Sequence, residues 1–226
     1  MIKATFESGK KIITCGNGGS ASTASHYITD WNKMVNLATR KKFRGVSLCD
    51  NVGLITAYGN DLTYADVFAG QIDALMDETK ALGMDSIAIT DHGALYGTVQ
   101  FVQAATKRGI KPIIGVETYV ARRGMGDKEG KADQQPFHLV LLATNAVGYR
   151  NLCRLVTDAH LDGMYYKPRI DLDHLAKYSE GLIGLSGCLN GEIARALEVD
   201  DWEHARALAG RYGDIFGKDR FYLEVQ

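Results

Sequence analysis

Short apolar runs alternate along the chain with longer stretches in which apolar residues recur every three to four positions. The short runs are rich in Ile, Val and Leu and are bounded by Gly, Asp or Asn, which is typical of buried β-strands. We predict seven strands, at residues 11–15, 45–49, 86–90, 112–116, 139–143, 181–185 and 221–225. The longer periodic stretches predict helices at residues 20–36, 51–58, 62–82, 94–108, 146–160, 190–197 and 201–216.

This alternation predicts an α/β fold with a mostly parallel sheet built from βα units. Seven strands would also suffice for a closed seven-stranded βα barrel, which is the alternative. We favour an open, flavodoxin-like order for the N-terminal part, because a βαβ unit buried on both faces tends to keep its own neighbours. No linker interrupts the predicted helix at 62–82, so we expect residues 1–226 to form one hybrid domain. Residues 122–135 are rich in glycine and charge, and we expect an exposed, mobile loop there.

Composition excludes several classes of function. The 226 residues carry 26 Lys and Arg against 27 Asp and Glu, which gives a net charge of -1. The chain therefore lacks the excess of positive charge that is typical of nucleic-acid-binding proteins. No apolar run is long enough to span a bilayer and no signal peptide is recognisable, so we expect no membrane association. The four cysteines are widely spaced without a CxxC pair, which indicates a cytoplasmic protein rather than one held by disulfides.

The first chemical signature is a strand that runs through a glycine turn into a helix, with the sequence IITCGNGGS at residues 12–20. Backbone N–H groups and the helix dipole at such a terminus attract an anion such as phosphate or sulfate. The same pattern is equally typical of a plain tight turn. The candidate phosphate-binding residues are Gly18, Gly19, Ser20 and Ser22.

A second candidate pair lies on the helix that follows. His26 and Asp30 are four residues apart and share a helix face. This spacing is more often a surface polar pair than a set of ligands.

The glycine turn, together with SLCD at residues 47–50 and YGND at residues 58–61, resembles the sugar isomerase (SIS) family, and most closely its phosphoheptose isomerase branch. The resemblance covers about residues 1–72. It implies that Ser20 and Ser22 contact phosphate and that Asp50 lies at the rim of the sugar pocket. It also implies that His26 and Asp30 occupy metal or catalytic positions.

Another signature places His92, Glu117 and Cys188 at or just beyond the carboxyl ends of predicted strands. Parallel α/β folds gather their functional groups at that edge. Imidazole, carboxylate and thiolate are competent ligands for zinc or a similar divalent ion. Asp91 could orient a ligand or bind the ion directly. His138 precedes its predicted strand, so parallel geometry alone would put it at the opposite end of the sheet.

These residues belong to motifs that resemble the PHP (polymerase and histidinol phosphatase) domain, as found at the start of bacterial DNA polymerase III alpha subunits. The motifs are AITDHG at 88–93, GIKPIIGVE at 109–117, FHLVLLA at 137–143, YYKPRI at 165–170 and SGCL at 186–189. The resemblance covers about residues 73–226. It implies a segment of a TIM-barrel-like βα barrel and a metal centre with ligands at His92, Glu117, His138 and Cys188. Some members hydrolyse phosphoesters or act as a 3'-5' exonuclease.

Both resemblances are incomplete. The chain contains no His-x-His pair, it ends at Gln226 before the Asp-x-His pair of PHP proteins, and no second phosphate loop follows Asp61. We therefore expect an engineered chimera, made to test whether fragments of two α/β folds can be recombined and present in the cytoplasm of its expression host.

We expect this chimera to have no native catalytic activity and no required cofactor. It would bind at most one divalent metal ion (zinc or manganese) or a phosphate or sulfate anion. One alternative is a metal-dependent phosphoesterase or 3'-5' exonuclease of the PHP type. The other is a phosphosugar-binding module of the sugar isomerase family that uses the glycine turn.

Overall fold

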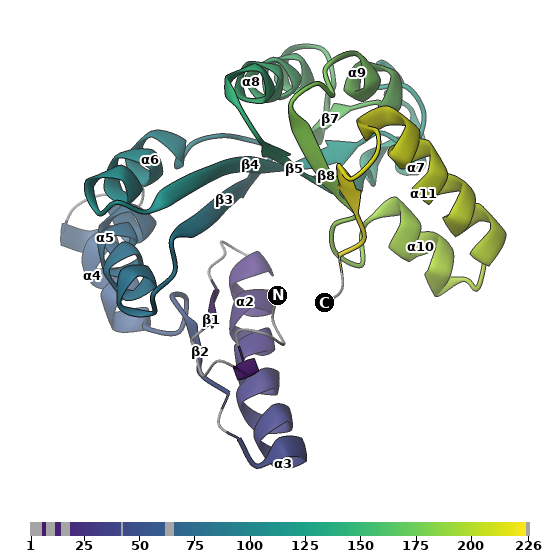
Figure 1. Cartoon of the computed structure of the whole chain (residues 1–226). Helices are drawn as coiled ribbons and strands as arrows, with labels where there is room; N and C mark the ends of the chain where they lie inside the picture. Colours follow the sequence, from purple (N-terminus) through teal and green to yellow (C-terminus); the bar gives the residue numbers. More distant parts are fainter. Residues whose placement is uncertain (1–5, 8–11, 15–18, 42, 62–65, 225–226) are drawn as a thin grey trace. The chain divides into compact units, whose positions relative to one another are not determined.

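The computed structural model describes residues 6–7, 12–14, 19–41, 43–61 and 66–224 (Figure 1). Contacts between residues divide the chain into two compact units. The first unit comprises Met1–Ser86 with Gln100–Lys111, and the second comprises Ile87–Val99 with Pro112–Gln226. Within the described residues, we find no helix with the length and apolar character needed to cross a membrane.

The first unit contains a two-stranded parallel sheet of β1 (Ile12–Thr14) and β2 (Gly45–Ser47). The helix α2 (Gly19–Asp30) packs against both strands and buries Ala24 and Ile28. A Cβ atom at Gly45 would lie 2.7 Å from Cδ1 of Ile28. Glycine here lets helix and strand approach closely, and a larger residue would force the Ile28 side chain to shift.

The helix α2 continues through a π-helical turn, η1 (Trp31–Val35), into α3 (Asn36–Thr39). Asn32 on this turn donates to the Gly45 carbonyl at 3.1 Å and accepts from the Gly45 N–H at 3.0 Å. The side-chain amide satisfies both backbone groups of the strand residue and so fixes the helix to β2. The helix ends at Arg40, which adopts a left-handed conformation with φ of 56°.

Three further helices complete the first unit. They are α4 (Val52–Asp61), α5 (Asp66–Ala81) and most of α6 (Thr98–Lys107). Arg108 follows α6 and donates to Asp73 and Asp77 of α5, at 2.7 and 2.5 Å. The core of this unit includes Met76 from α5 and Phe101 from α6.

A seven-stranded mixed sheet forms the frame of the second unit. Its strands are β3 (Ser86–His92), β4 (Lys111–Val120), β5 (Phe137–Ala143), β6 (Met164–Tyr165), β7 (Lys167–Ile170), β8 (Leu182–Leu185) and β9 (Phe221–Tyr222). They pair in the order β6-β7-β4-β5-β8-β9, and β3 pairs with β4. The strand β5 is antiparallel to both of its neighbours, whereas β4 with β7 and β8 with β9 are parallel pairs.

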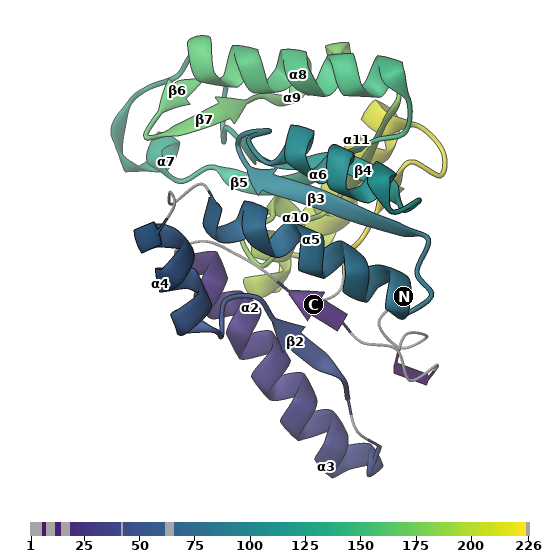
Figure 2. The same ribbon diagram turned by 90° about the vertical axis from the view of Figure 1, so that its left-hand side faces the viewer.

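Four helices accompany this sheet. They are α8 (Ala146–Leu161), α9 (Leu172–Lys177), α10 (Glu192–Glu198) and α11 (Trp202–Phe216). The helix α8 packs on β5 and β7, as Figure 2 shows, and α11 packs on β8 and α10. Asn145 caps α8 by accepting from the N–H groups of Val147 and Gly148. The buried residues between helices and sheet include Leu141, Leu155 and Phe216.

The segment predicted as a loop at 122–135 contains the short helix α7 (Gly130–Gln134) and is held by a buried arginine. Arg169 of β7 is fully buried, and its guanidinium donates to the carbonyl oxygens of Met125, Asp127 and Asp133. Asp133 is itself buried and accepts from Arg123 at 2.5 Å. This segment is stabilised by polar contacts and not by an apolar stripe. For this reason hydrophobic periodicity did not predict its helix.

The α/β class and the position of each predicted element are confirmed within the described residues, with bounds that shift by a few positions. The pattern missed β6, β7 and α9. The mostly parallel sheet is corrected to a mixed one, because β5 runs antiparallel to β4 and β8, and hydrophobic periodicity predicts where a strand lies but not its direction. The predicted continuity of one sheet is also corrected, since β1 and β2 form their own sheet. In the described residues, the larger sheet ends at β6 and β9 and does not close into a barrel.

Candidate metal centre

Four potential metal ligands come together at one end of the strands of the second unit. His92 is the last residue of β3, Glu117 lies in β4, His138 is the second residue of β5 and Cys188 follows β8. The N–H of Gly93 donates to the Glu117 carbonyl at 2.9 Å, which places the end of β3 beside β4.

The antiparallel direction of β5 explains why His138 is at this site. His138 pairs with Tyr119, one residue before β4 ends. An antiparallel strand begins where its neighbour finishes, so a residue at the start of β5 meets residues at the carboxyl end of β4. The expectation that His138 lies at the opposite end of the sheet was wrong, because it assumed a parallel strand.

The ligand atoms lie close enough to share one ion. One atom from each of His92, Glu117 and His138 lies within 4.8 Å of the other two. Glu117 Oε1 is 2.6 Å from Nδ1 of His138 and 3.6 Å from Nδ1 of His92. The Sγ atom of Cys188 is 3.6 Å from Nδ1 of His138 and accepts from the N–H of Asn190.

This hydrogen-bonded chain changes the pKa of two of its members. Burial lowers the pKa of His138, but the hydrogen bonds to Cys188 and Glu117 outweigh burial and raise the pKa to about 9. Burial raises the pKa of Cys188, but the hydrogen bonds from His138 and from the Asn190 N–H lower it overall. Without a metal ion, a protonated His138 between a carboxylate and a sulfur atom is therefore the favoured state.

The donor set fits a divalent metal ion. Two ligands of one tetrahedral zinc ion stand roughly 3.3–3.8 Å apart, given bond lengths of about 2.0–2.3 Å. The 3.6 Å separations of Glu117 from His92 and of Cys188 from His138 are close to that value. The 2.6 Å contact between Glu117 and His138 is a hydrogen bond, and it would have to open by less than about 1 Å.

Two neighbours of the site have other contacts. The carboxylate of Asp91 accepts from the N–H of Gly97 at 2.9 Å and holds the turn after β3. It is not one of the three residues whose ligand atoms gather within 4.8 Å. Tyr119, which the sequence analysis did not single out, stacks beside His92 and meets His138 edge-on, with ring centroids 6.2 and 5.1 Å apart. Burial raises the pKa of the Tyr119 hydroxyl, and the charge of Glu117 raises it further.

The candidate phosphate turn in the first unit lies partly outside the described residues. Gly18 is not among them, Gly19 and Ser20 begin α2, and Ser22 is exposed on that helix. His26 Nε2 lies 3.1 Å from Asp30 Oδ2. Both side chains are half or more exposed, as in a surface pair.

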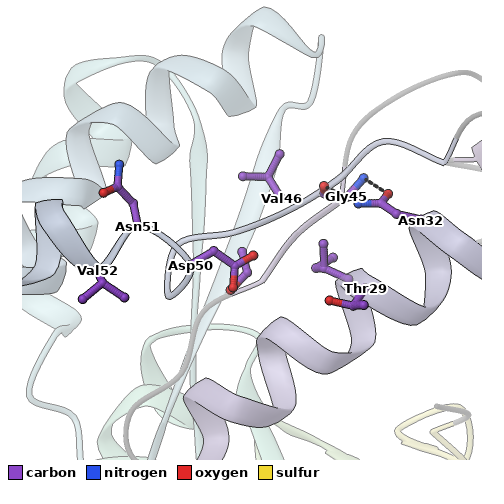
Figure 3. Close-up of a pocket in the computed structure, with 9 residues that line it drawn as sticks. Thr29, Asn32, Gly45, Val46, Asp50, Asn51 and Val52 are labelled. Carbon is purple, nitrogen blue, oxygen red and sulfur yellow. Dashed lines mark hydrogen bonds between the residues drawn. The ribbon is translucent and has the colours of Figure 1, made fainter.

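A separate cavity of about 530 Å³ lies in the first unit beside β2 (Figure 3). Asp50, predicted at a sugar-pocket rim, lines it together with Thr29 and Asn51. Figure 3 shows Thr29 and Asn32 reaching it from the helix side, and Asp50 from the turn after β2. It shares no residue with the metal centre.

Two phosphoheptose isomerase structures are similar to part of this chain. The enzyme from Neisseria gonorrhoeae is 28% identical over 48% of this chain and 53% of that chain, with a TM-score of 0.32. The enzyme from Francisella tularensis is 26% identical over 51% of this chain and 58% of that chain, with a TM-score of 0.37.

Curated relatives match the C-terminal two thirds more strongly. The DNA polymerase III subunit alpha of Borreliella burgdorferi is 43% identical over 159 residues, which are 70% of this chain and 14% of the relative. The corresponding subunit of Thermus aquaticus is 48% identical over 143 residues, 62% of this chain and 12% of the relative. The matched part is thus a small portion of these relatives. The PHP domain family itself matches residues 68–226, and the chain therefore belongs to the PHP domain family.

Proposed function

We propose that the second unit binds one divalent metal ion through His92, Glu117 and His138, with Cys188 as a fourth ligand. The observation that carries the proposal is the convergence of three donor atoms within 4.8 Å at the ends of three strands. A thiolate among the donors favours zinc over the harder manganese ion.

The chain's own residues prepare this position. Glu117 and Cys188 hold a proton on His138 Nδ1 when no ion is present, and an ion would replace that proton as their shared positive partner. The N–H of Asn190 stabilises the sulfur as an anion. In related chemistry a bound divalent ion acts as a Lewis acid on a phosphoryl oxygen.

We infer that this site does not hydrolyse phosphoesters or DNA ends appreciably. A hydrolytic centre of several metals needs ligands from many strands, and the sequence contains no His-x-His pair. Among the described residues, His92, Glu117 and His138 are the one group of three candidate ligands whose donor atoms lie within 4.8 Å of one another. The competing proposal, a metal-dependent phosphoesterase or 3'-5' exonuclease, is supported by the family and by the same ligands.

The test is hydrolysis of a chromogenic phosphoester with zinc or manganese added, for the unmodified chain and for His92→Ala. We expect both proteins to give the same background rate. A rate that depends on metal and disappears in His92→Ala would establish a working enzyme and overturn the inactive assignment.

We also propose that the chain is an engineered fusion of a sugar isomerase-like fragment and a PHP fragment. The family match begins at residue 68, inside α5. Residues on both sides of this point belong to the first unit, where α5 packs against α4. This arrangement supports a fusion whose fragments share one core.

The rival for this part of the chain is a phosphosugar-binding module. Sedoheptulose 7-phosphate should not be isomerised and should raise the melting temperature by only a small amount. The sequence retains one of the two phosphate loops that the sugar isomerase resemblance implies. A shift that saturates at micromolar sugar phosphate would favour the phosphosugar-binding module instead.

A further inference from the structure

The position of His92 depends on the turn that follows β3. His92 is the last residue of β3, which lies outside the main strand order and pairs with β4. Glu117 and His138 lie in β4 and β5, each of which has strand partners on both sides. The His92 side chain is 37% exposed, against 17% for Glu117 and 19% for His138. Packing within the sheet therefore restrains His92 less than it restrains the other two candidate ligands.

The turn after His92 is held by a backbone hydrogen bond and by close packing. The N–H of Gly93 donates to the Glu117 carbonyl at 2.9 Å. Gly93 has a φ of 62°, and a Cβ atom there would lie 2.9 Å from Cγ of Pro168 and 3.0 Å from Cε2 of Tyr119. Both the conformation and the available space favour glycine. The path of the chain after His92 is therefore set by contacts with β4 and β7.

A histidine that the sequence analysis did not single out contacts the same turn. His160 lies in the last turn of α8, and its Nε2 atom is 2.8 Å from the carbonyl oxygen of Gly93. Because a carbonyl oxygen can only accept, Nε2 is the donor and carries a proton. The backbone of Gly93 is therefore bonded to β4 through its N–H and to α8 through its carbonyl.

The helix that carries His160 is firmly packed. It contacts β5 and β7, and its residues Leu152 and Leu155 are fully buried in the core of the second unit. The His160 side chain is itself partly buried. A donor on a packed element is a rigid support, and metal ligands are commonly oriented by supporting contacts of this kind.

We propose that His160 is a positioning residue for the metal centre, which holds the turn after β3 so that the His92 ring meets Glu117 and His138. The inference rests on the proposed metal site and adds to it a support from a helix. Metal ligands must converge on one point, so a β3 end that is free to move lowers the affinity for the ion. His160 acts through Gly93 and not by binding the ion, because its Nε2 atom already donates to the Gly93 carbonyl.

The experiment measures zinc affinity of the full chain and of His160 variants by competition with a chromogenic chelator. His160→Leu keeps most of the side-chain bulk but has no donor. It should bind zinc about tenfold more weakly, the lower end of the loss that follows removal of a group supporting a metal ligand. His160→Gln can place an amide N–H near the position of Nε2, so it should restore most of the affinity. Circular dichroism verifies that each variant is folded.

Cobalt(II) in place of zinc reports the geometry of the site, because its visible absorption depends on the number and arrangement of its ligands. We expect the spectrum of His160→Leu to change towards that of His92→Ala, and the spectrum of His160→Gln to match that of the unmodified chain. A role confined to stability would lower the melting temperature in EDTA and leave the cobalt spectrum unchanged. If His160→Leu does not fold, His160→Asn replaces it, since its amide is one methylene shorter than that of glutamine.

A matched control is His174→Leu. The Nε2 atom of His174 lies 2.8 Å from Oδ2 of Asp158, so this variant also removes a histidine hydrogen bond to α8, but at a place away from the turn after β3. It should lower the melting temperature and leave the zinc affinity and the cobalt spectrum unchanged.

The possible results separate the two proposals. Zinc affinity that His160→Leu leaves unchanged, or that His160→Leu and His160→Gln lower equally, would overturn the positioning role while the metal site stands. Absence of zinc binding in the unmodified chain would contradict the proposed metal site, and the positioning role with it.

Discussion

At the scale of single residues, Glu117, His138 and Cys188 of the second unit are joined by short contacts between their side chains. His138 lies between Glu117 and Cys188, and its pKa is raised to about 9 by these partners. Glu117 and Cys188 could be predicted as candidate ligands because each follows a predicted strand. Their convergence with His138 was implied by the family resemblance alone, because strand geometry could not supply the antiparallel direction of β5.

Replacement of Cys188 tests the fourth ligand. Cys188→Ser should lower zinc affinity by about 10- to 100-fold, because a hydroxyl is a much weaker zinc ligand than a thiolate. Competition with a chromogenic zinc chelator measures the change. Cys153→Ser is the control, since Cys153 lies on α8, outside the group of metal ligands. An unchanged affinity in Cys188→Ser would remove the thiolate from the site.

A buried carboxylate gives the second prediction at this scale. Burial raises the pKa of Asp158, but hydrogen bonds from Arg154 and His174 outweigh burial and lower the pKa below its usual 3.8. The ionised carboxylate therefore stabilises the fold above about pH 4, and this contribution disappears as the pH falls through the lowered pKa.

Asp158→Asn should accordingly lower the melting temperature at pH 7, and the difference in melting temperature from the unmodified chain should shrink as the pH falls from 4 towards 2. Asp173→Asn, at an exposed position of α9, should show little difference at any pH. A difference for Asp158→Asn that stays constant with pH would show that the carboxylate charge is not responsible.

At the scale of elements, hydrophobic periodicity predicted the strands and helices well, because most are defined by apolar residues that face a core. It missed α7, β6, β7 and α9, which are only two to six residues long and depend in part on polar contacts. Arg169 illustrates the reason. Its sequence position reads as a surface cation, yet it is fully buried and is satisfied by backbone carbonyls from a distant segment.

Two helical glycines allow a sharp test of how the second unit packs. A Cβ atom at Gly148 on α8 would overlap the carbonyl of Gly181, whereas a Cβ atom at Gly210 on α11 would meet nothing within 4 Å. Gly148→Ala should destabilise the protein by about 1–3 kcal/mol through overpacking. Gly210→Ala should stabilise it by about 0.5–1 kcal/mol through helix propensity.

Urea denaturation of both variants measures these free energies of unfolding. Equal and small effects would mean that α8 does not approach residue 181 as closely as described.

At the scale of the whole chain, the two compact units divide the chain at a different place from the family match. The PHP match begins at residue 68, yet the first unit extends to Ser86 and also includes Gln100–Lys111. Helices from the PHP segment thus complete the core of the first unit. Sequence analysis could not place this division, because it depends on which helices contact each other rather than on composition.

The central claim is that the second unit retains a site for one divalent metal ion. The most direct test is elemental analysis of the full chain, loaded with zinc and then dialysed, for the unmodified chain and for His92→Ala. We expect about one zinc ion per chain for the unmodified protein and a much lower content for His92→Ala. Two or three ions per chain, or a content that His92→Ala leaves unchanged, would contradict it.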